Sequence, residues 1–193
     1  MSPEARRDQF IRLGLEMVSQ QPLEEVTIEK IAEVAGVSRA LLFHYFESKG
    51  DFHVAIAREQ ARQMLKCTAA DESLVDPLAM LRASMSAFIG YVCDNRVSYM
   101  AFMRGSASAD PAMREVFDDT RAAMAGRLTD QIRDLGTEVT PVLEMIVGGW
   151  IAFVEETTLS WLAAPVITRE ELLDVITASL PALAASAGVV PAG

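Results

Sequence analysis

Apolar residues recur three or four positions apart along almost the whole chain, and the alternation typical of a half-buried strand is nearly absent. This spacing is that of an amphipathic α-helix, so the pattern predicts an all-α fold. Beyond residue 50, four prolines stand at or near the ends of the periodic segments, as expected of a residue with no backbone N–H to donate: Pro77, Pro111, Pro141 and Pro165. In this part of the chain we expect helices at residues 51–70, 75–94, 96–107, 110–135, 139–163 and 168–186.

The first 50 residues predict three shorter helices. The first begins at Ser2, which can cap it, and ends before Pro22. Thr27 is expected to cap the second helix and Ser38 the third, with Gly36 permitting the tight turn between them. Two short helices joined in this way form either a helix-turn-helix, whose second helix enters the major groove of DNA, or a plain hairpin within a helical bundle.

The third predicted helix has two different faces. Leu42 and Phe46 lie four residues apart, so they share one face and are expected in the core. Arg39, Ala40 and His44 fall largely on the other faces. The outer side of this helix is therefore left for a binding partner.

The net charge of the chain is −10, which argues against non-specific binding to nucleic acid or to an anionic membrane. Residues 1–53 carry six Lys and Arg against nine Asp and Glu, a net charge of −3. Any DNA-binding surface must therefore be a narrow basic strip of Arg39, Lys49 and arginines of the first helix. We expect weak non-specific binding and a steep dependence on salt, because each neutralised phosphate releases counterions.

Within residues 26–52, the motif T-I-x-x-I-A-x-x-A-G-V-S-x-x-x-L-F-x-Y-F-x-S-K-x-x-F runs without interruption from Thr27 to Phe52. It resembles the N-terminal segment of the TetR family of bacterial transcriptional regulators. The resemblance is close over about a quarter of the chain and extends to general helical architecture beyond it. It implies a helix-turn-helix DNA-binding domain at residues 1–50 and an effector-binding and dimerisation domain at residues 51–193.

The family's DNA contacts can be carried over to matching positions. Thr27 corresponds to a phosphate contact, although the same hydroxyl could serve only as a helix cap. Tyr45 could be a core aromatic instead, and His44 a surface histidine. Phe43 stands where the family often has tyrosine, and Leu41 is bulkier than usual but could meet a thymine methyl. The residues that we expect at the DNA are Thr27, Ser38, Arg39, Leu41, Phe43, His44, Tyr45 and Lys49.

The second half of the chain is rich in methionine and aromatic residues. Most such residues fill a helical core, but flexible methionines also suit an adaptable apolar pocket, and the resemblance implies an effector pocket here. The residues that we expect to line it are Met85, Phe88, Phe102, Met103, Trp150 and Phe153. By the same resemblance the last two helices pair with a symmetry mate, and the residues expected in that interface are Gly148, Gly149, Trp161, Leu172 and Ile176.

Several other classes of protein find little support. Cys67 and Cys93 form no CxxC pair or Cys/His cluster, so we expect neither a metal nor a disulfide framework. No phosphate-binding loop, HExxH or GxSxG motif is present, and we expect no cofactor and no catalytic site. The longest strongly apolar run, at 145–154, is far shorter than the roughly 20 residues that span a bilayer. We therefore expect a cytoplasmic protein that does not bind membranes.

These observations together predict a homodimeric transcriptional regulator, most simply a repressor, that binds a palindromic DNA operator. A small apolar or amphipathic effector in the C-terminal domain would release it. Three alternatives stay open. The protein could be an activator or act without an effector, the helical domain could be a protein-interaction module that no longer binds specific DNA, or the bundle could be a hydrolase or lyase.

Overall fold

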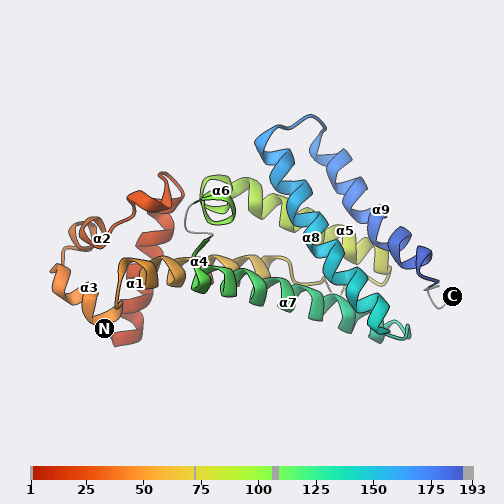
Figure 1. The fold of residues 1–193 in the computed structure, drawn as a ribbon, viewed down its shortest axis with the longest axis horizontal. Helices are drawn as coiled ribbons and strands as arrows, with labels where there is room; N and C mark the ends of the chain where they lie inside the picture. Colours follow the sequence, from red (N-terminus) through yellow and green to blue (C-terminus); the bar gives the residue numbers. More distant parts are fainter. Residues whose placement is uncertain (1, 72, 106–108, 189–193) are drawn as a thin grey trace. The chain divides into compact units, whose positions relative to one another are not determined.

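The computed structural model describes residues 2–71, 73–105 and 109–188, which form α-helices, one short 3-10 helix and no strand (Figure 1). The all-α prediction is confirmed. Helix α6 ends before its predicted end at residue 107, which lies outside the described residues. The elements are α1 (Pro3–Val18), η1 (Leu23–Glu25), α2 (Ile28–Ala35), α3 (Arg39–Tyr45), α4 (Lys49–Cys67), α5 (Pro77–Asp94), α6 (Arg96–Arg104), α7 (Pro111–Asp134), α8 (Pro141–Ala163) and α9 (Arg169–Ser186).

The predicted helix caps of the first three helices are present. The side-chain oxygen of Ser2 accepts a hydrogen bond from the backbone N–H of Ala5 at 3.1 Å. Thr27 and Ser38 cap α2 and α3 in the same way, three residues ahead of their donors. Each cap satisfies an N–H group that the first helical turn leaves without an intrahelical partner, so these residues set where the helices begin.

The chain forms two compact units, Met1–Met64 with Asp94–Phe117, and Leu65–Cys93 with Asp118–Gly193. They are called here the first and second unit. The division follows packing and therefore differs from the boundary at residues 50 and 51, which concerns function and stays a prediction. The first unit has a core to which α1–α4, α6 and α7 contribute, including Phe10, Ile31, Leu42, Phe46, Phe52, Ile56, Phe102 and Met113.

Helices α1 and α4 pack very closely in the first unit. A Cβ atom on Gly14 would lie 2.5 Å from the Cδ1 atom of Ile56, so only glycine fits without a shift of that buried side chain. One turn earlier on α4, the ring of His53 makes a buried 2.8 Å hydrogen bond with the carbonyl oxygen of Val26. This bond ties α4 to the residue just before the cap of α2.

The turn between α2 and α3 depends on a left-handed residue. Gly36 has a φ of 65°, a conformation that side chains with a Cβ atom rarely adopt, and the N–H of Val37 donates to the carbonyl of Ala32 at 3.0 Å. The buried residues Ile31 and Leu42, one on each helix, lie in the same core. The outer face of α3 is thereby fixed relative to α2.

In the second unit α8 and α9 run side by side and are joined by a short loop (Figure 1). Trp150 of α8 is buried, and its indole N–H donates to the hydroxyl of Ser179 of α9 at 2.8 Å. Other apolar residues of the two helices are buried as well, including Leu143, Val147, Leu172 and Ile176. The two helices therefore share a core within one chain.

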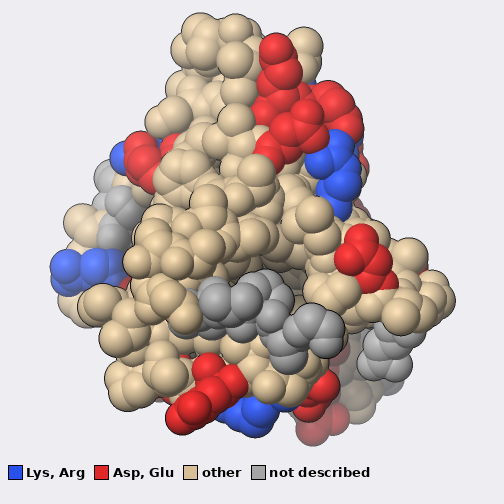
Figure 2. Space-filling model, turned by 90° about the vertical axis from the view of Figure 1, so that its right-hand side faces the viewer, with Lys and Arg blue, Asp and Glu red and all other residues tan. Residues whose placement is uncertain are grey.

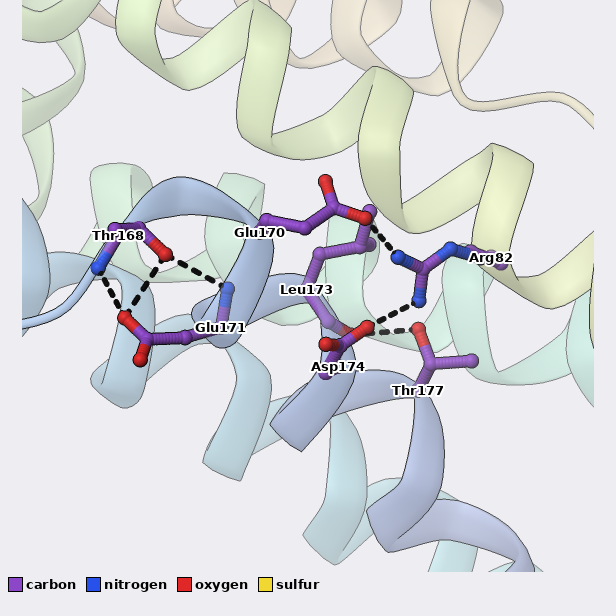
Figure 3. Close-up of polar contacts among 7 residues, drawn as sticks. All are labelled: Arg82, Thr168, Glu170, Glu171, Leu173, Asp174 and Thr177. Carbon is purple, nitrogen blue, oxygen red and sulfur yellow. Dashed lines mark hydrogen bonds and ion pairs between the residues drawn. The ribbon is translucent and has the colours of Figure 1, made fainter.

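Two arginine contacts hold other helices of this unit together. Arg82 of α5 binds both Glu170 and Asp174 of α9, close to the capping box of Thr168 and Glu171 that begins α9 (Figure 3). Arg121 of α7 binds both carboxylate oxygens of Glu155 of α8, at 2.7 and 3.0 Å. No helix in the described ranges is long and apolar enough to cross a membrane.

Candidate nucleic-acid interface

The outer face of α3 presents polar and aromatic side chains to solvent. Leu42 and Phe46 are buried in the core, as their spacing predicts, while Arg39, Phe43 and His44 are exposed. Phe43 keeps 43% of its surface exposed. This face is therefore accessible to a second molecule.

Arg39 begins α3 and is held by two neighbours. Its Nε atom lies 2.9 Å from a carboxylate oxygen of Glu29 in α2, and its guanidinium carbon lies 5.5 Å from the centre of the Phe43 ring. The pKa of Glu29 is lowered, chiefly by a hydrogen bond from its own backbone N–H and further by the charge of Arg39 and the hydroxyl of Thr27. The ion pair is solvent-exposed, so it orients Arg39 more than it stabilises the fold.

Lys49 begins α4 and is also positioned by the chain. Its ammonium group donates to the backbone carbonyl of Glu24 at 2.6 Å. The preceding residue, Ser48, accepts from the N–H of Asp51 at 3.0 Å, and the Asp51 carboxylate accepts from the N–H of Glu47 at 3.1 Å. These reciprocal bonds fix the start of α4 and with it the place of Lys49.

The remaining predicted DNA residues are less exposed. Thr27 and Leu41 are half-buried, and Ser38 is exposed with its hydroxyl used as the cap of α3. Tyr45 is half-buried, with its ring 5.6 Å from that of Phe10 and 5.4 Å from that of His44, both edge to face. Tyr45 thus packs on the core while His44 stays at the surface.

Sequence reasoning missed two features of this region. Glu29 was counted only as an acidic residue, yet it is the partner of Arg39. Arg7 of α1 lies with its guanidinium carbon 5.1 Å from the centre of the ring of Phe46, a core residue. Neither contact follows a local spacing rule, because each joins residues far apart in the sequence.

A pocket of about 310 Å³ opens beside Lys49 within the first unit. Its apolar lining comes from Leu23, Val54 and Met113, and its polar lining includes both acidic and basic side chains. The charges of both signs give it no clear preference for one class of ligand. The lining residues are Leu23, Glu24, Lys49, Gly50, His53, Val54, Asp110 and Met113.

The six residues predicted to line an effector pocket are divided between the two units. Phe102 and Met103 belong to the first unit, where Phe102 packs in the core, and the other four belong to the second. Met85, Phe88 and Trp150 are buried, whereas Phe153 is 39% exposed. The prediction that these residues share a pocket stays a prediction.

The residues predicted at a subunit interface differ in accessibility. Gly148 and Gly149 are exposed on α8, and Trp161 is half-buried with its indole N–H donating to the carbonyl of Ile167 at 2.8 Å. Leu172 and Ile176 are 0% exposed because they pack inside their own chain. A partner could not reach these two side chains, so an interface on α9 has to use other residues.

The described residues contain no candidate metal site and no reactive thiol. No group of three or more His, Cys, Asp or Glu side chains there is arranged to hold a metal ion. Neither Cys67 nor Cys93 forms a disulfide, and partial burial raises the pKa of the Cys67 thiol. A raised pKa makes this thiol less reactive.

Figure 2 shows a face of the molecule on which uncharged residues cover most of the described surface. Acidic side chains form separate groups there, with fewer basic ones among them. DNA-binding surfaces usually carry a cluster of Lys and Arg. The outer face of α3, with Arg39 and the nearby Lys49, is therefore the better candidate for DNA.

A capped helix, a left-handed glycine turn and a second helix with an exposed face of Arg39, Phe43 and His44 define a helix-turn-helix of the DNA-binding class. The family model "Bacterial regulatory proteins, tetR family" matches residues 10–56, and the model "Tetracyclin repressor-like, C-terminal domain" matches residues 77–182. The chain belongs to the TetR family of DNA-binding transcriptional regulators.

Individual relatives agree with this assignment. A TetR-family transcriptional regulator from Streptomyces coelicolor has a crystal structure with a TM-score of 0.82, at 28% identity, covering 96% of this chain and 83% of that one. An HTH-type transcriptional regulator of Mycobacterium tuberculosis is 26% identical over 87% of this chain and 72% of its own length. The HTH-type transcriptional activator FasR of Mycolicibacterium smegmatis is 24% identical over 82% of this chain and 73% of its own length.

Proposed function

We propose that this regulator is a homodimeric repressor that leaves a palindromic operator when a small, largely apolar effector binds the second unit. The observation that carries the DNA-binding part is the exposed face of α3, where Arg39, Phe43 and His44 lie opposite the buried Leu42 and Phe46. Arg39 and Lys49 supply its positive charge. The protein would act on DNA in the cytoplasm.

An exposed apolar stripe on α8 and α9 supports the proposed dimer. Val142 and Met145 of α8 are 49% and 71% exposed, and Val175 of α9 is 49% exposed. Small exposed residues continue the stripe at helical spacing, with Gly149 and Ala152 on α8, and Ala178 and Ala182 on α9. A second copy would bury this stripe and set two α3 helices one turn of DNA apart, about 34–36 Å.

The buried hydroxyl of Thr158 in α8 supports an effector site in the second unit. Thr158 is 0% exposed, and its oxygen has no hydrogen-bond partner among the described residues. A buried polar group without a partner costs about 1–3 kcal/mol, which a ligand with a hydrogen-bonding group could recover. The half-buried Glu155, three residues earlier on the same helix and paired with Arg121, would be the nearby charged group.

Activation of transcription is the second candidate. The relative FasR is named a transcriptional activator, so the family resemblance alone does not favour repression. The position of the operator decides between the two roles. A regulator whose operator overlaps the promoter would exclude the polymerase, and one whose operator lies upstream could recruit it.

The first experiment is a selection of bound fragments from a genomic DNA pool at low salt. The wild-type protein should enrich a palindrome, and the Arg39→Ala/Lys49→Ala variant should not. A Lys66→Ala/Arg133→Ala variant, which loses the same charge outside the proposed interface, should enrich the same palindrome as the wild type. Enrichment of no sequence by wild-type protein that has been unfolded and refolded free of ligand would contradict the proposal.

The regulatory part is tested by transcription in vitro from a template that carries the selected operator. Repression predicts less transcript as protein is added, and recovery when an apolar effector binds. More transcript on addition of protein would show activation instead. Linkage requires the effector to lower operator affinity by the same factor as the operator lowers effector affinity, and unequal factors at equilibrium would refute this scheme.

A further inference from the structure

Arg39 is held in one orientation before any DNA arrives. Its Nε atom pairs with Glu29 at 2.9 Å, and the Phe43 ring lies 5.5 Å from the guanidinium carbon. Arginine side chains have many rotamers, and fixing one of them costs free energy that a bound partner would otherwise have to supply. Two neighbours on the outer face of the helix-turn-helix reduce that cost for Arg39.

These contacts leave the two terminal nitrogens of the Arg39 guanidinium available to DNA. The ion pair with Glu29 is made at Nε, and the two terminal nitrogens of Arg39 donate no hydrogen bond to any described residue. The terminal nitrogens of an arginine can donate together to O6 and N7 of a guanine in the major groove.

We infer that Glu29 and Phe43 are positioning residues that prepare Arg39 to recognise a guanine in each operator half-site. The inference rests on the proposed operator binding. It adds that the recognised base is guanine and that Glu29 and Phe43 make its recognition specific. Glu29 contributes by holding Nε, and Phe43 by the contact of its ring with the guanidinium group.

Glu29 could also act by repelling DNA phosphates, and this role has to be distinguished from the positioning of Arg39. A carboxylate near the DNA repels phosphates, so its removal would tighten binding to every sequence alike. A positioning residue behaves differently, because its removal lowers the preference for guanine over other bases. The ratio of two affinities therefore distinguishes positioning from simple repulsion.

The test uses the selected operator and a copy in which the guanine assigned to Arg39 is replaced by 7-deazaguanine in one half-site. This analogue lacks the N7 acceptor but keeps O6 and base pairing. The assigned guanine is the position at which Arg39→Ala loses its base preference. Dissociation constants for both duplexes are measured by fluorescence anisotropy at one fixed salt concentration, and their ratio gives the discrimination of each variant.

Wild-type protein should bind the analogue roughly fivefold or more weakly, as the loss of a good base contact predicts. Arg39→Ala should give a ratio near one, and Glu29→Gln and Phe43→Leu should lower the ratio towards one. Glu29→Asp should lower it too, because this shorter side chain keeps the charge but does not reach Nε. The control is Glu33→Gln, which removes one exposed carboxylate from the next turn of α2 and should keep the wild-type ratio.

Two results would overturn the inference while the proposed function stands. In the first, a selected operator shows no base preference that depends on Arg39. In the second, Glu29→Gln and Glu29→Asp keep the wild-type ratio, which would leave Glu29 with no positioning role. Failure of the wild-type protein to select any sequence is a different outcome, since it contradicts operator binding itself.

Discussion

Gly14 allows α1 and α4 to pack closely, because a Cβ atom at this position would lie 2.5 Å from Cδ1 of the fully buried Ile56. We expect Gly14→Ala to lower the free energy of unfolding by about 1–3 kcal/mol through overpacking. Gly126→Ala in α7 should raise it by about 0.5–1 kcal/mol, because open space surrounds that position and alanine favours helices. Urea denaturation measures both, and equal effects of the two substitutions would contradict the packing argument.

His53 should make stability depend on pH. Burial lowers the pKa of its imidazole, although the hydrogen bond with Val26 opposes the shift. The folded pKa therefore lies below the unfolded value of about 6.5, and the stabilisation by neutral His53 is present above that value and is lost as pH falls through the folded pKa. Unfolding of wild type and His53→Gln from pH 7.5 to 5 checks this, since the stability advantage of the wild type should shrink on acidification. A constant difference would refute it.

At the scale of helices, the sequence predicts what depends on neighbours a few residues apart. The caps at Ser2, Thr27 and Ser38 were predicted correctly, because each joins a side chain to a backbone group three residues on. The burial of Leu42 and Phe46 follows in the same way from helical periodicity. Most of the fold could therefore be anticipated without a structure.

Contacts between helices could not be anticipated in the same way. Periodicity identifies the apolar face of α9 but does not say what covers it. Leu172 and Ile176 were therefore expected in the subunit interface, whereas they are buried within their own chain. The pairing of Arg39 with Glu29 likewise depends on how α2 meets α3. For the candidate site, the sequence predicts which residues contact DNA but not how these residues lie relative to one another.

The two arginine contacts between helices of the second unit should differ in strength. Glu155 has only 16% of its side chain exposed, so Arg121→Met would leave a half-buried carboxylate without its partner, at a cost of about 1–3 kcal/mol. Arg82→Met should cost less than about 1 kcal/mol, because Glu170 and Asp174 are 71% and 61% exposed and water can replace the arginine. Thermal and urea unfolding of both variants give the comparison.

A double variant provides the control for this prediction. Arg121→Met/Glu155→Leu removes both charges, so it should recover part of the stability that Arg121→Met loses. If Arg82→Met proves as damaging as Arg121→Met, burial of the partner is not what decides the strength of these contacts.

At the scale of the whole molecule, the exposed stripe on α8 and α9 predicts the oligomeric state. Met145, at 71%, is the most exposed of its large apolar side chains, and Met145→Asp would place a charge in an apolar interface. We expect sedimentation equilibrium to show wild-type dimers, and the variant close to the monomer mass of 21.0 kDa. The variant should also bind the full palindrome much more weakly, since one α3 helix reads only one half-site.

Leu135→Asp serves as the matched control, because Leu135 is 46% exposed just beyond the end of α7 and is not one of the residues of the stripe. It should leave both the mass and the operator affinity unchanged. A Met145→Asp protein that stays dimeric would place the subunit interface elsewhere.

The pairing of Arg39 with Glu29 also affects how the regulator searches a genome. A chromosome offers about 10⁶ or more competing sites of random sequence, and most DNA-binding proteins spend much of their time on them. A recognition helix whose arginine is already balanced by a carboxylate releases few counterions at such sites, so each visit should be short. We expect few copies to be sequestered on random DNA, and occupancy of the operator should then follow the number of active dimers in the cell.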